Sequence, residues 1–178
     1  MAESTLSLRQ IGIVLLLSAL AGWFLLPALG AKLHNSIGEP LADFSLPVIV
    51  GGDKGSRQSL SALRGKIVLL DFWATWCGPC RESLPLVERL AREHRKQNLV
   101  VLGINQGEKP EQIQQFYASH DPGYAILSDG DGNVSGQLGI NGLPTLVVVD
   151  ATGKLRGTIA GVVPYARLER LVAEAGGP

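Results

Sequence analysis

Two cysteines, Cys77 and Cys80, are separated by only two residues, and the chain has no others. The stretch before them, residues 66–72, has the apolar run of a buried parallel strand, and residues 81–94 after them predict a helix. Cys77 is therefore expected where a strand ends and a helix begins, so backbone N–H groups and the positive end of the helix dipole point at it. Such a position stabilises a thiolate, the nucleophile of disulfide exchange. Cys80, one turn further on, is close enough to attack a mixed disulfide formed on Cys77.

Other uses of a Cys-x-x-Cys pair fit this chain less well. A structural zinc site needs four cysteine or histidine ligands, but the three histidines are scattered along the chain. A haem attachment signal has histidine after the second cysteine, where this chain has Arg81. A purely structural disulfide would close too short a loop to stabilise the fold much. The pair therefore predicts a catalytic dithiol without a bound metal.

The amino-terminal segment predicts export of the chain. No charged residue occurs between Arg9 and Lys32, and residues 11–26 are almost wholly apolar. A run of about 20 such residues can cross a bilayer. Small residues at 28–31 offer a signal peptidase site, but the apolar run is longer than a typical signal core, so we favour an uncleaved anchor. The expected location is the periplasmic side of a bacterial inner membrane, or outside it after cleavage.

These observations divide the chain into two parts. Residues 1–34 are assigned to the membrane anchor or signal segment with its linker, and residues 35–178 to one soluble domain. Sixteen basic residues balance sixteen acidic ones, so the charge gives no reason to expect nucleic acid as a partner.

The soluble domain has the pattern of alternating strands and helices followed by a hairpin. Residues 48–50 and 57–60 flank a glycine-rich turn and predict an amino-terminal hairpin. Further strands are expected at residues 67–72, 98–104, 124–127, 145–149 and 155–160, and helices at residues 81–94, 110–120, 131–138 and 165–175. This order predicts an α/β fold whose mixed sheet is covered on both faces.

Three stretches of the chain resemble the TlpA/ResA group of membrane-anchored, thioredoxin-like proteins. They are GEPLADFSLP at residues 38–47, LRGKIVLLDFWATWCGPCRESLP at residues 63–85, and NVSGQLGINGLPTLVVVDATGKL at residues 133–155. The resemblance covers nearly the whole soluble domain. It implies a thioredoxin-like fold with an amino-terminal β-hairpin and a central αβ insertion, matching residues 110–127, preceded by one transmembrane or signal-anchor helix.

The resemblance also implies an activity, which is cofactor-free exchange of disulfides with other proteins. Members of the group reduce the disulfide of apocytochrome c before haem is attached to its cysteines, or the disulfide between copper-site cysteines of oxidase subunits. Their electrons come from a membrane protein that passes reducing equivalents outward. The Gly78-Pro79 dipeptide accompanies reducing behaviour in related proteins, whereas relatives dedicated to cytochrome c maturation usually carry a different one. We therefore expect a reductase, with its physiological substrate left open.

Five residues around the dithiol are expected to contact substrate. Trp76 should lie over the two sulfurs and form a docking surface with Gly78 and Pro79. Pro144 matches the cis-proline that packs against the Cys-x-x-Cys pair in thioredoxin-like proteins. Leu143 matches the residue before that proline, which offers its backbone groups to an extended substrate peptide.

The proton acceptor for Cys80 is expected to be Asp71, six residues before Cys77. Thioredoxins have a buried aspartate at this place, whereas many TlpA/ResA-like proteins have asparagine there and a glutamate three residues after the second cysteine. This chain has Ser83 at the glutamate position, and Glu82 beside it. One residue is about 100° of rotation around a helix, so Glu82 should face another direction. The apolar run before Asp71 indicates burial, which would raise its pKa into a useful range.

Two other classes of protein share features with this chain. Thiol peroxidases have a similar opening, but their reactive cysteine follows a Pro-x-x-x-Thr-x-x-Cys pattern that residues 74–77 do not fit. Copper carriers of related fold separate their cysteines by three residues and add a distant histidine. Here the separation is two, and His120 lies in a polar stretch. Peroxide consumption and copper titration would distinguish these alternatives.

Overall fold

A seven-stranded mixed sheet forms the centre of the described chain, which in this computed structural model comprises residues 37–94 and 97–176. The strand order is β2-β1-β5-β4-β3-β6-β7. The strands are β1 Ser45–Val50, β2 Arg57–Ser59, β3 Ile67–Trp73, β4 Leu99–Gln106, β5 Ala125–Asp129, β6 Thr145–Val149 and β7 Leu155–Ala160. Strand β4 pairs in parallel with β3 and β5, whereas β6 pairs antiparallel with β3 and with β7. The expected amino-terminal hairpin is present as the antiparallel pair β1–β2.

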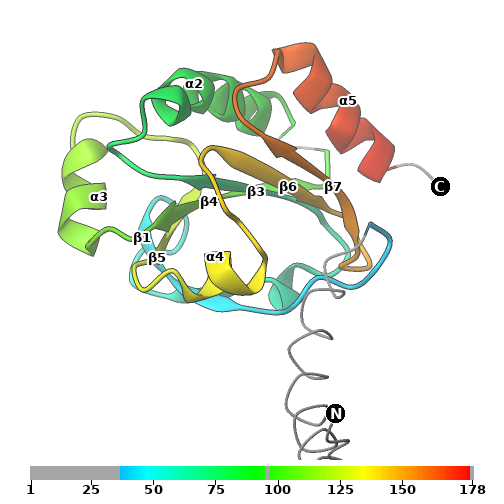
Figure 1. Cartoon of the computed structure of the whole chain (residues 1–178), viewed down its shortest axis with the longest axis horizontal. Helices are drawn as coiled ribbons and strands as arrows, with labels where there is room; N and C mark the ends of the chain where they lie inside the picture. Colours follow the sequence, from blue (N-terminus) through cyan, green and yellow to red (C-terminus); the bar gives the residue numbers. More distant parts are fainter. Residues whose placement is uncertain (1–36, 95–96, 177–178) are drawn as a thin grey trace, which may run out of the picture. The chain divides into compact units, whose positions relative to one another are not determined.

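Helices cover both faces of this sheet. They are α2 Gly78–Glu93, α3 Pro110–Phe116, α4 Asn133–Gln137 and α5 Tyr165–Ala175, with a 3-10 turn η1 at Ser61–Leu63. Figure 1 shows α2 and α5 together on one face and α4 on the other. Two buried clusters follow this division. One includes Leu84 of α2 and Leu168 of α5, and the other includes Val134 of α4 and Phe44 from the amino-terminal stretch.

Strand β3 supplies side chains to both layers of the core. Because side chains alternate along a strand, Leu69 and Trp73 join the cluster under α2 and α5, whereas Leu70 and Phe72 join the opposite cluster. Asp71 shares the alternation of Leu69 and Trp73, so it faces α2. The alternation along β3 therefore places the Asp71 carboxyl group within an apolar layer of the core.

The observed elements follow the predicted order closely, and the thioredoxin-like α/β fold with a mixed sheet is confirmed. Strands β6 and β7 and helix α5 have the predicted bounds. Helix α2 begins at Gly78 instead of residue 81, because the Cys77 side chain caps it and Pro79 fits its first turn. Helix α3 ends at Phe116 instead of residue 120, and the next side chain, Tyr117, turns into the core.

The predicted membrane segment, residues 1–34, lies outside the described residues, and so does its boundary with the domain. Both stay predictions. Within residues 37–94 and 97–176, no helix combines the length and the apolar character needed to span a bilayer.

Candidate active site

The two cysteines lie at the amino-terminal end of α2 and are joined by a disulfide, with their Cα atoms 5.2 Å apart. Cys77 is the N-cap residue, and its Sγ accepts a hydrogen bond from the backbone N–H of Cys80 at 3.2 Å. This is the location where helix N–H groups and the helix dipole favour a negative charge. Cys77 is 5% exposed and Cys80 is fully buried, so Cys77 is the sulfur nearer to solvent. The geometry suits a thiolate on Cys77 after reduction.

The residues beside the disulfide form an exposed rim. Trp76 is 70% exposed, which is unusual for a side chain of this size. Pro79 is exposed and Gly78 is half-buried. A large aromatic surface held out in solvent next to a redox-active pair is the kind of feature that a protein partner covers.

The second predicted substrate segment lies opposite Trp76. The Leu143–Pro144 peptide bond is cis, as the resemblance implied. Pro144 is buried, and Leu143 is half-buried and packs against the cluster that contains both cysteines. A pocket of about 390 Å³ lies between Trp76, the 106–107 turn and the 140–143 loop. The structure therefore brings two of the expected substrate residues, Trp76 and Leu143, to one groove.

Asp71 is completely buried on the α2 side of β3. Its neighbours across the sheet are Gly103 of β4 and Leu146 of β6, and Leu146 belongs to the same cluster as Cys77 and Cys80. Neither carboxyl oxygen has a hydrogen-bond partner among the described residues. Desolvation by burial raises the pKa of Asp71 from an ordinary 3.8 to about 7. A carboxyl group in this range can gain and lose a proton near neutral pH.

The two other candidates for an acid–base role differ from Asp71. Glu82 is exposed on α2, in agreement with the helical rotation predicted from the sequence. Ser83 is buried, and its hydroxyl donates to the Cys80 carbonyl oxygen at 2.9 Å. A small neutral side chain therefore occupies the position where many TlpA/ResA-like proteins carry glutamate.

One buried carboxylate was not found by the sequence analysis. Glu108 is 4% exposed and accepts hydrogen bonds from the Thr75 N–H at 2.7 Å and the Thr75 hydroxyl at 2.5 Å. It also accepts from the Asn105 side-chain amide at 2.7 Å. Thr75 precedes Trp76 and Cys77, so Glu108 fixes the loop that leads into the disulfide. Its position in a polar stretch, Gly-Glu-Lys-Pro, gave no sign of burial.

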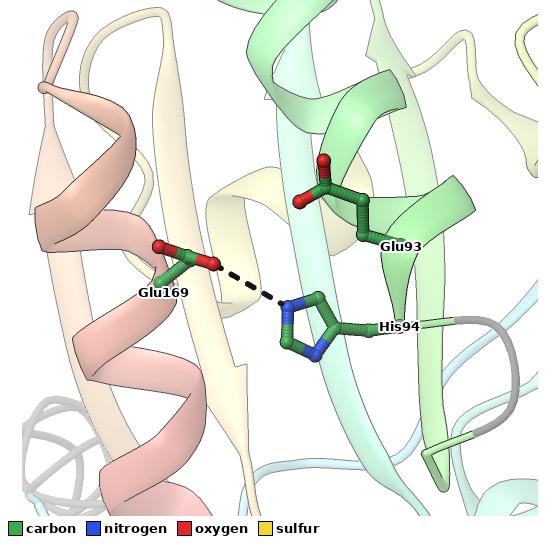
Figure 2. A group of neighbouring side chains, drawn as sticks. All are labelled: Glu93, His94 and Glu169. Carbon is green, nitrogen blue, oxygen red and sulfur yellow. Dashed lines mark ion pairs between the residues drawn. The ribbon is translucent and has the colours of Figure 1, made fainter.

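A separate titratable cluster lies where α2 meets α5. Glu93, His94 and Glu169 offer ligand atoms within 4.8 Å of one another, and Figure 2 shows His94 directed toward Glu169. The distance between His94 Nε2 and Glu169 Oε1 is 3.8 Å. Glu93 is already paired, because it accepts from Arg89 and from the Tyr165 hydroxyl. We infer that these partly exposed side chains help to hold the two helices together.

Comparison with known proteins gives consistent likenesses. The model of the AhpC/TSA family matches residues 37–158. The thiol:disulfide interchange protein DsbE of Pseudomonas fluorescens biotype C is 37% identical over 128 residues, which cover 71% of this chain and 68% of the relative. The thiol-disulfide oxidoreductase ResA of Geobacillus thermodenitrificans is 29% identical over 161 residues, which cover 90% of each.

A solved structure extends the likeness to three dimensions. The crystal structure of a DsbE-type thiol:disulfide interchange protein from Chlorobium tepidum superimposes with a TM-score of 0.72 at 30% identity. The alignment covers 79% of this chain and 99% of that one. The region matched by the family model contains the β1–β2 hairpin, the Cys77–Cys80 pair and the cis-proline loop.

Proposed function

Because this chain belongs to the AhpC/TSA family and is a thiol-disulfide oxidoreductase similar to ResA and DsbE, we propose that it is an exported reductase of protein disulfides. The observation that carries this proposal is the capped position of Cys77. Its sulfur accepts a hydrogen bond from a helix N–H, and the residue before it, the exposed Trp76, lines a groove together with Leu143 of the cis-proline loop. An extended peptide bearing a disulfide fits such an arrangement better than a small buried substrate would.

The proposed reaction has two exchange steps. The Cys77 thiolate attacks a sulfur of the substrate disulfide, which forms a mixed disulfide and releases one substrate thiolate. Cys80 then gives its proton to the Asp71 carboxylate, and the resulting thiolate attacks Cys77 Sγ. The second substrate thiolate leaves, so the substrate gains two electrons and the Cys77–Cys80 pair becomes a disulfide. Asp71 returns its proton to solvent or to the leaving thiolate before the next cycle.

Substrate contact is assigned to the rim of the groove. Trp76 and Leu143 line the groove itself. Gly78 and Pro79 follow the reactive sulfur in the chain, and Pro144 follows Leu143, so we assign these three to the same contact. The backbone of Leu143 would pair with an extended segment of the substrate, in the manner of a strand added at a sheet edge.

The setting proposed for this reaction is outside the cytoplasm. The uncharged segment between Arg9 and Lys32 supports a membrane anchor with the domain on the periplasmic side. A membrane protein would then supply the electrons that reduce the Cys77–Cys80 disulfide after each cycle. Protein cysteines awaiting haem or copper are the substrate classes that the resemblance favours.

Trapping of partners tests this proposal. A Cys80→Ser variant made in a bacterial host with its amino-terminal segment intact cannot resolve the mixed disulfide, so partners should accumulate on Cys77. The matched control, Cys77→Ser with Cys80→Ser, should trap none. Identification of exported proteins with paired cysteines would support the proposal. Exclusively cytoplasmic partners, or consumption of peroxide at a rate exceeding that of protein disulfide reduction, would contradict it.

A further inference from the structure

A set of buried polar atoms around Asp71 lacks hydrogen-bond partners. Both carboxyl oxygens of Asp71 accept nothing within the described part of the chain, and three nearby donors are equally unpaired there. These donors are the Trp73 indole N–H and the hydroxyls of Tyr117 and Tyr124, and the two hydroxyls lie close enough to each other that each shifts the pKa of the other. All four side chains are at least nine-tenths buried. Unpaired buried polar groups are uncommon in folded proteins and require a physical reason.

Gly103 explains how these groups come together. It lies directly beside Asp71 in the parallel register of β3 and β4, and it has no side chain to fill that place. A Cβ atom there would lie 2.7 Å from Ile126 Cδ1, 3.1 Å from a Tyr124 ring carbon and 3.3 Å from Trp73 Nε1. The absence of a side chain at Gly103 therefore lets Ile126, the tyrosine ring and the indole nitrogen pack close to the strand beside Asp71.

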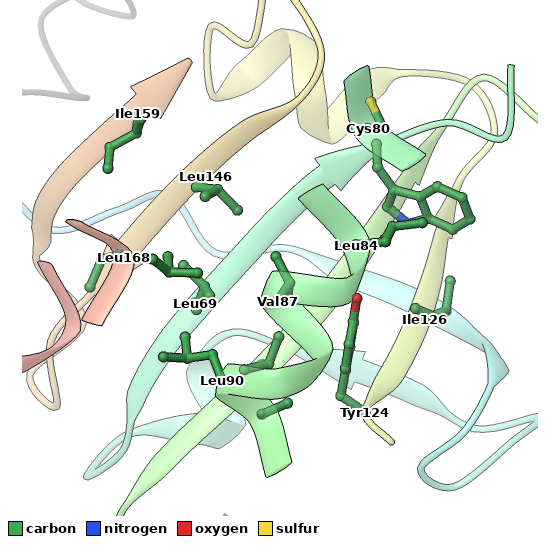
Figure 3. Close-up of a cluster of buried hydrophobic side chains, with 14 of the residues drawn as sticks. Leu69, Cys80, Leu84, Val87, Leu90, Tyr124, Ile126, Leu146, Ile159 and Leu168 are labelled. Atoms are coloured by element: carbon green, nitrogen blue, oxygen red, sulfur yellow. The ribbon is translucent and has the colours of Figure 1, made fainter. Parts of the chain in front are cut away.

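Tyr117, the residue that follows α3, is the remaining member of this group of polar side chains. Its ring packs edge-on against Trp73, with ring centres 5.5 Å apart. Figure 3 shows Tyr124 standing upright beneath α2, with its hydroxyl directed toward Leu84. The charge of Asp71 contributes to a raised pKa for both tyrosines, behind desolvation as the larger cause, which agrees with their closeness to the carboxyl group.

The other ionisable groups facing this space are few in the described residues. Cys77 lies at the N-cap of α2, and Cys80 and Glu88 lie within that helix. The charge of Glu88 also raises the pKa values of the two tyrosines. Glu88 is bound to the exposed His120 at 2.6 Å. Burial alone raises the pKa of Asp71, and no lysine or arginine of the described residues contributes to the shift. Within the described residues, the groups that can stabilise an ionised Asp71 are therefore neutral hydrogen-bond donors.

We propose that Tyr117 and Tyr124, with the Trp73 indole, are positioning residues that donate hydrogen bonds to Asp71 when it is ionised and so keep it usable as the base for Cys80. This inference rests on the role of Asp71 proposed above. Donation to the charged form favours that form. With the disulfide closed and Asp71 neutral, the carboxyl group has little need of donors. When Asp71 ionises, a small shift of the surrounding side chains brings these donors within hydrogen-bond distance of the carboxylate.

The test follows the two exchange steps separately. Full-length reduced protein in detergent is mixed with 5,5′-dithiobis(2-nitrobenzoate), which releases one coloured thiolate when Cys77 attacks and a second when Cys80 resolves. The rate of the second release, measured against pH, reports the titration of the base. Tyr124→Phe and Tyr117→Phe keep the rings and remove only the hydroxyls. Tyr165→Phe, a tyrosine on the surface of α5, is the matched control.

The expected result is a shift confined to the second step. A hydrogen bond to a charged group corresponds to about one pKa unit, so the midpoint should rise by about one pH unit in Tyr124→Phe and in Tyr117→Phe. The first release should keep its pH profile, and Tyr165→Phe should match the wild type. In an Asp71→Asn background, Tyr124→Phe should have no further effect on the second step.

The outcomes separate this inference from the proposed function. If Asp71→Asn flattens the profile but both tyrosine variants keep the wild-type midpoint, the tyrosines are not donors to Asp71 and the base assignment stands. If the tyrosine shift persists in the Asp71→Asn background, it does not act through Asp71 and the inference is wrong. If Asp71→Asn itself leaves the profile unchanged, the proposed role of Asp71 fails first. Infrared titration of the Asp71 carbonyl band in the oxidised protein gives an independent readout of how each variant titrates at Asp71.

Discussion

Replacement of Asp71 by asparagine should stabilise the oxidised domain increasingly as the pH rises. The folded state holds a proton on Asp71 up to about pH 7, because burial disfavours the carboxylate. The unfolded chain releases that proton near the ordinary pKa of 3.8. Between these values the folded state binds more protons than the unfolded state, so the stability of the wild type falls as the pH rises. Asparagine has a similar shape and does not titrate.

The size of the effect follows from the difference between the two pKa values. The difference is roughly three pH units, and each unit is worth about 1.4 kcal/mol, which gives about 4 kcal/mol above pH 7. Relaxation of the core around the carboxylate reduces this figure. We expect the variant to be equal to the wild type near pH 4 and more stable by about 2 to 4 kcal/mol at pH 8.

The assay is urea unfolding of residues 35–178 at several pH values, with the disulfide closed so that neither cysteine titrates. The quantity of interest is the difference between variant and wild type, because groups common to both then cancel. Glu82→Gln, which removes an exposed carboxylate from α2, is the control and should give a flat difference. A constant difference between Asp71→Asn and wild type from pH 4 to pH 8 would refute the reasoning, since it would mean that Asp71 titrates normally in the folded state.

Three other outcomes are expected. Alkylation of the reduced protein near neutral pH should modify Cys77 before Cys80, as mass spectrometry of the peptides would show, because Cys77 caps α2 and is the less buried thiol; faster labelling of Cys80 would reverse the assignment. Removal of residues 1–34 should leave a domain that unfolds cooperatively in urea, and a gradual transition would mean that the boundary is wrong. Glu108→Ala should destabilise the oxidised domain by about 3 kcal/mol, because it removes the acceptor of two donors on the half-buried Thr75 and one on the buried Asn105, whereas Glu108→Gln should cost about 1 kcal/mol; equal losses in the two variants would contradict this account.

Much of the fold could be predicted because local patterns and the tertiary structure agree. Strands β6 and β7 have alternating or continuous apolar residues between clear turns, and their bounds were predicted correctly. Helix α2 was predicted to begin three residues too late, because its first turn contains Gly78 and Pro79, which read as a loop in the sequence. The cap made by the Cys77 sulfur compensates for this local composition. A capping interaction through sulfur has no sequence pattern of its own.

The contacts that could not be predicted join residues far apart in the chain. Glu108 binds Thr75 across 33 positions, and nothing in the local sequence of either residue indicates the partner. The same holds for Asp71 and Tyr124, which meet only because β3, β4 and β5 are neighbours in the sheet. Their closeness also depends on Gly103, which reads in the sequence as an ordinary small residue within an apolar strand.

The position of the proposed base, Asp71, decides which residues can adjust its pKa. A glutamate on α2 would share its helix with Cys80, and its surroundings would be set by the first turns of that helix. This chain has Ser83 there, bonded to the Cys80 carbonyl, and its carboxyl group lies on β3 instead. A group on the central strand is surrounded by side chains of the neighbouring strands and of α3, which in a sequence are indistinguishable from apolar core. Tyr117 and Tyr124 are buried like such core residues, yet each carries a hydroxyl that can donate a hydrogen bond. With the proposed base on the strand, the side chains that can adjust its pKa are buried aromatic residues. Removal of a hydroxyl in the core should therefore alter the chemistry at Cys80 without any change at the exposed rim.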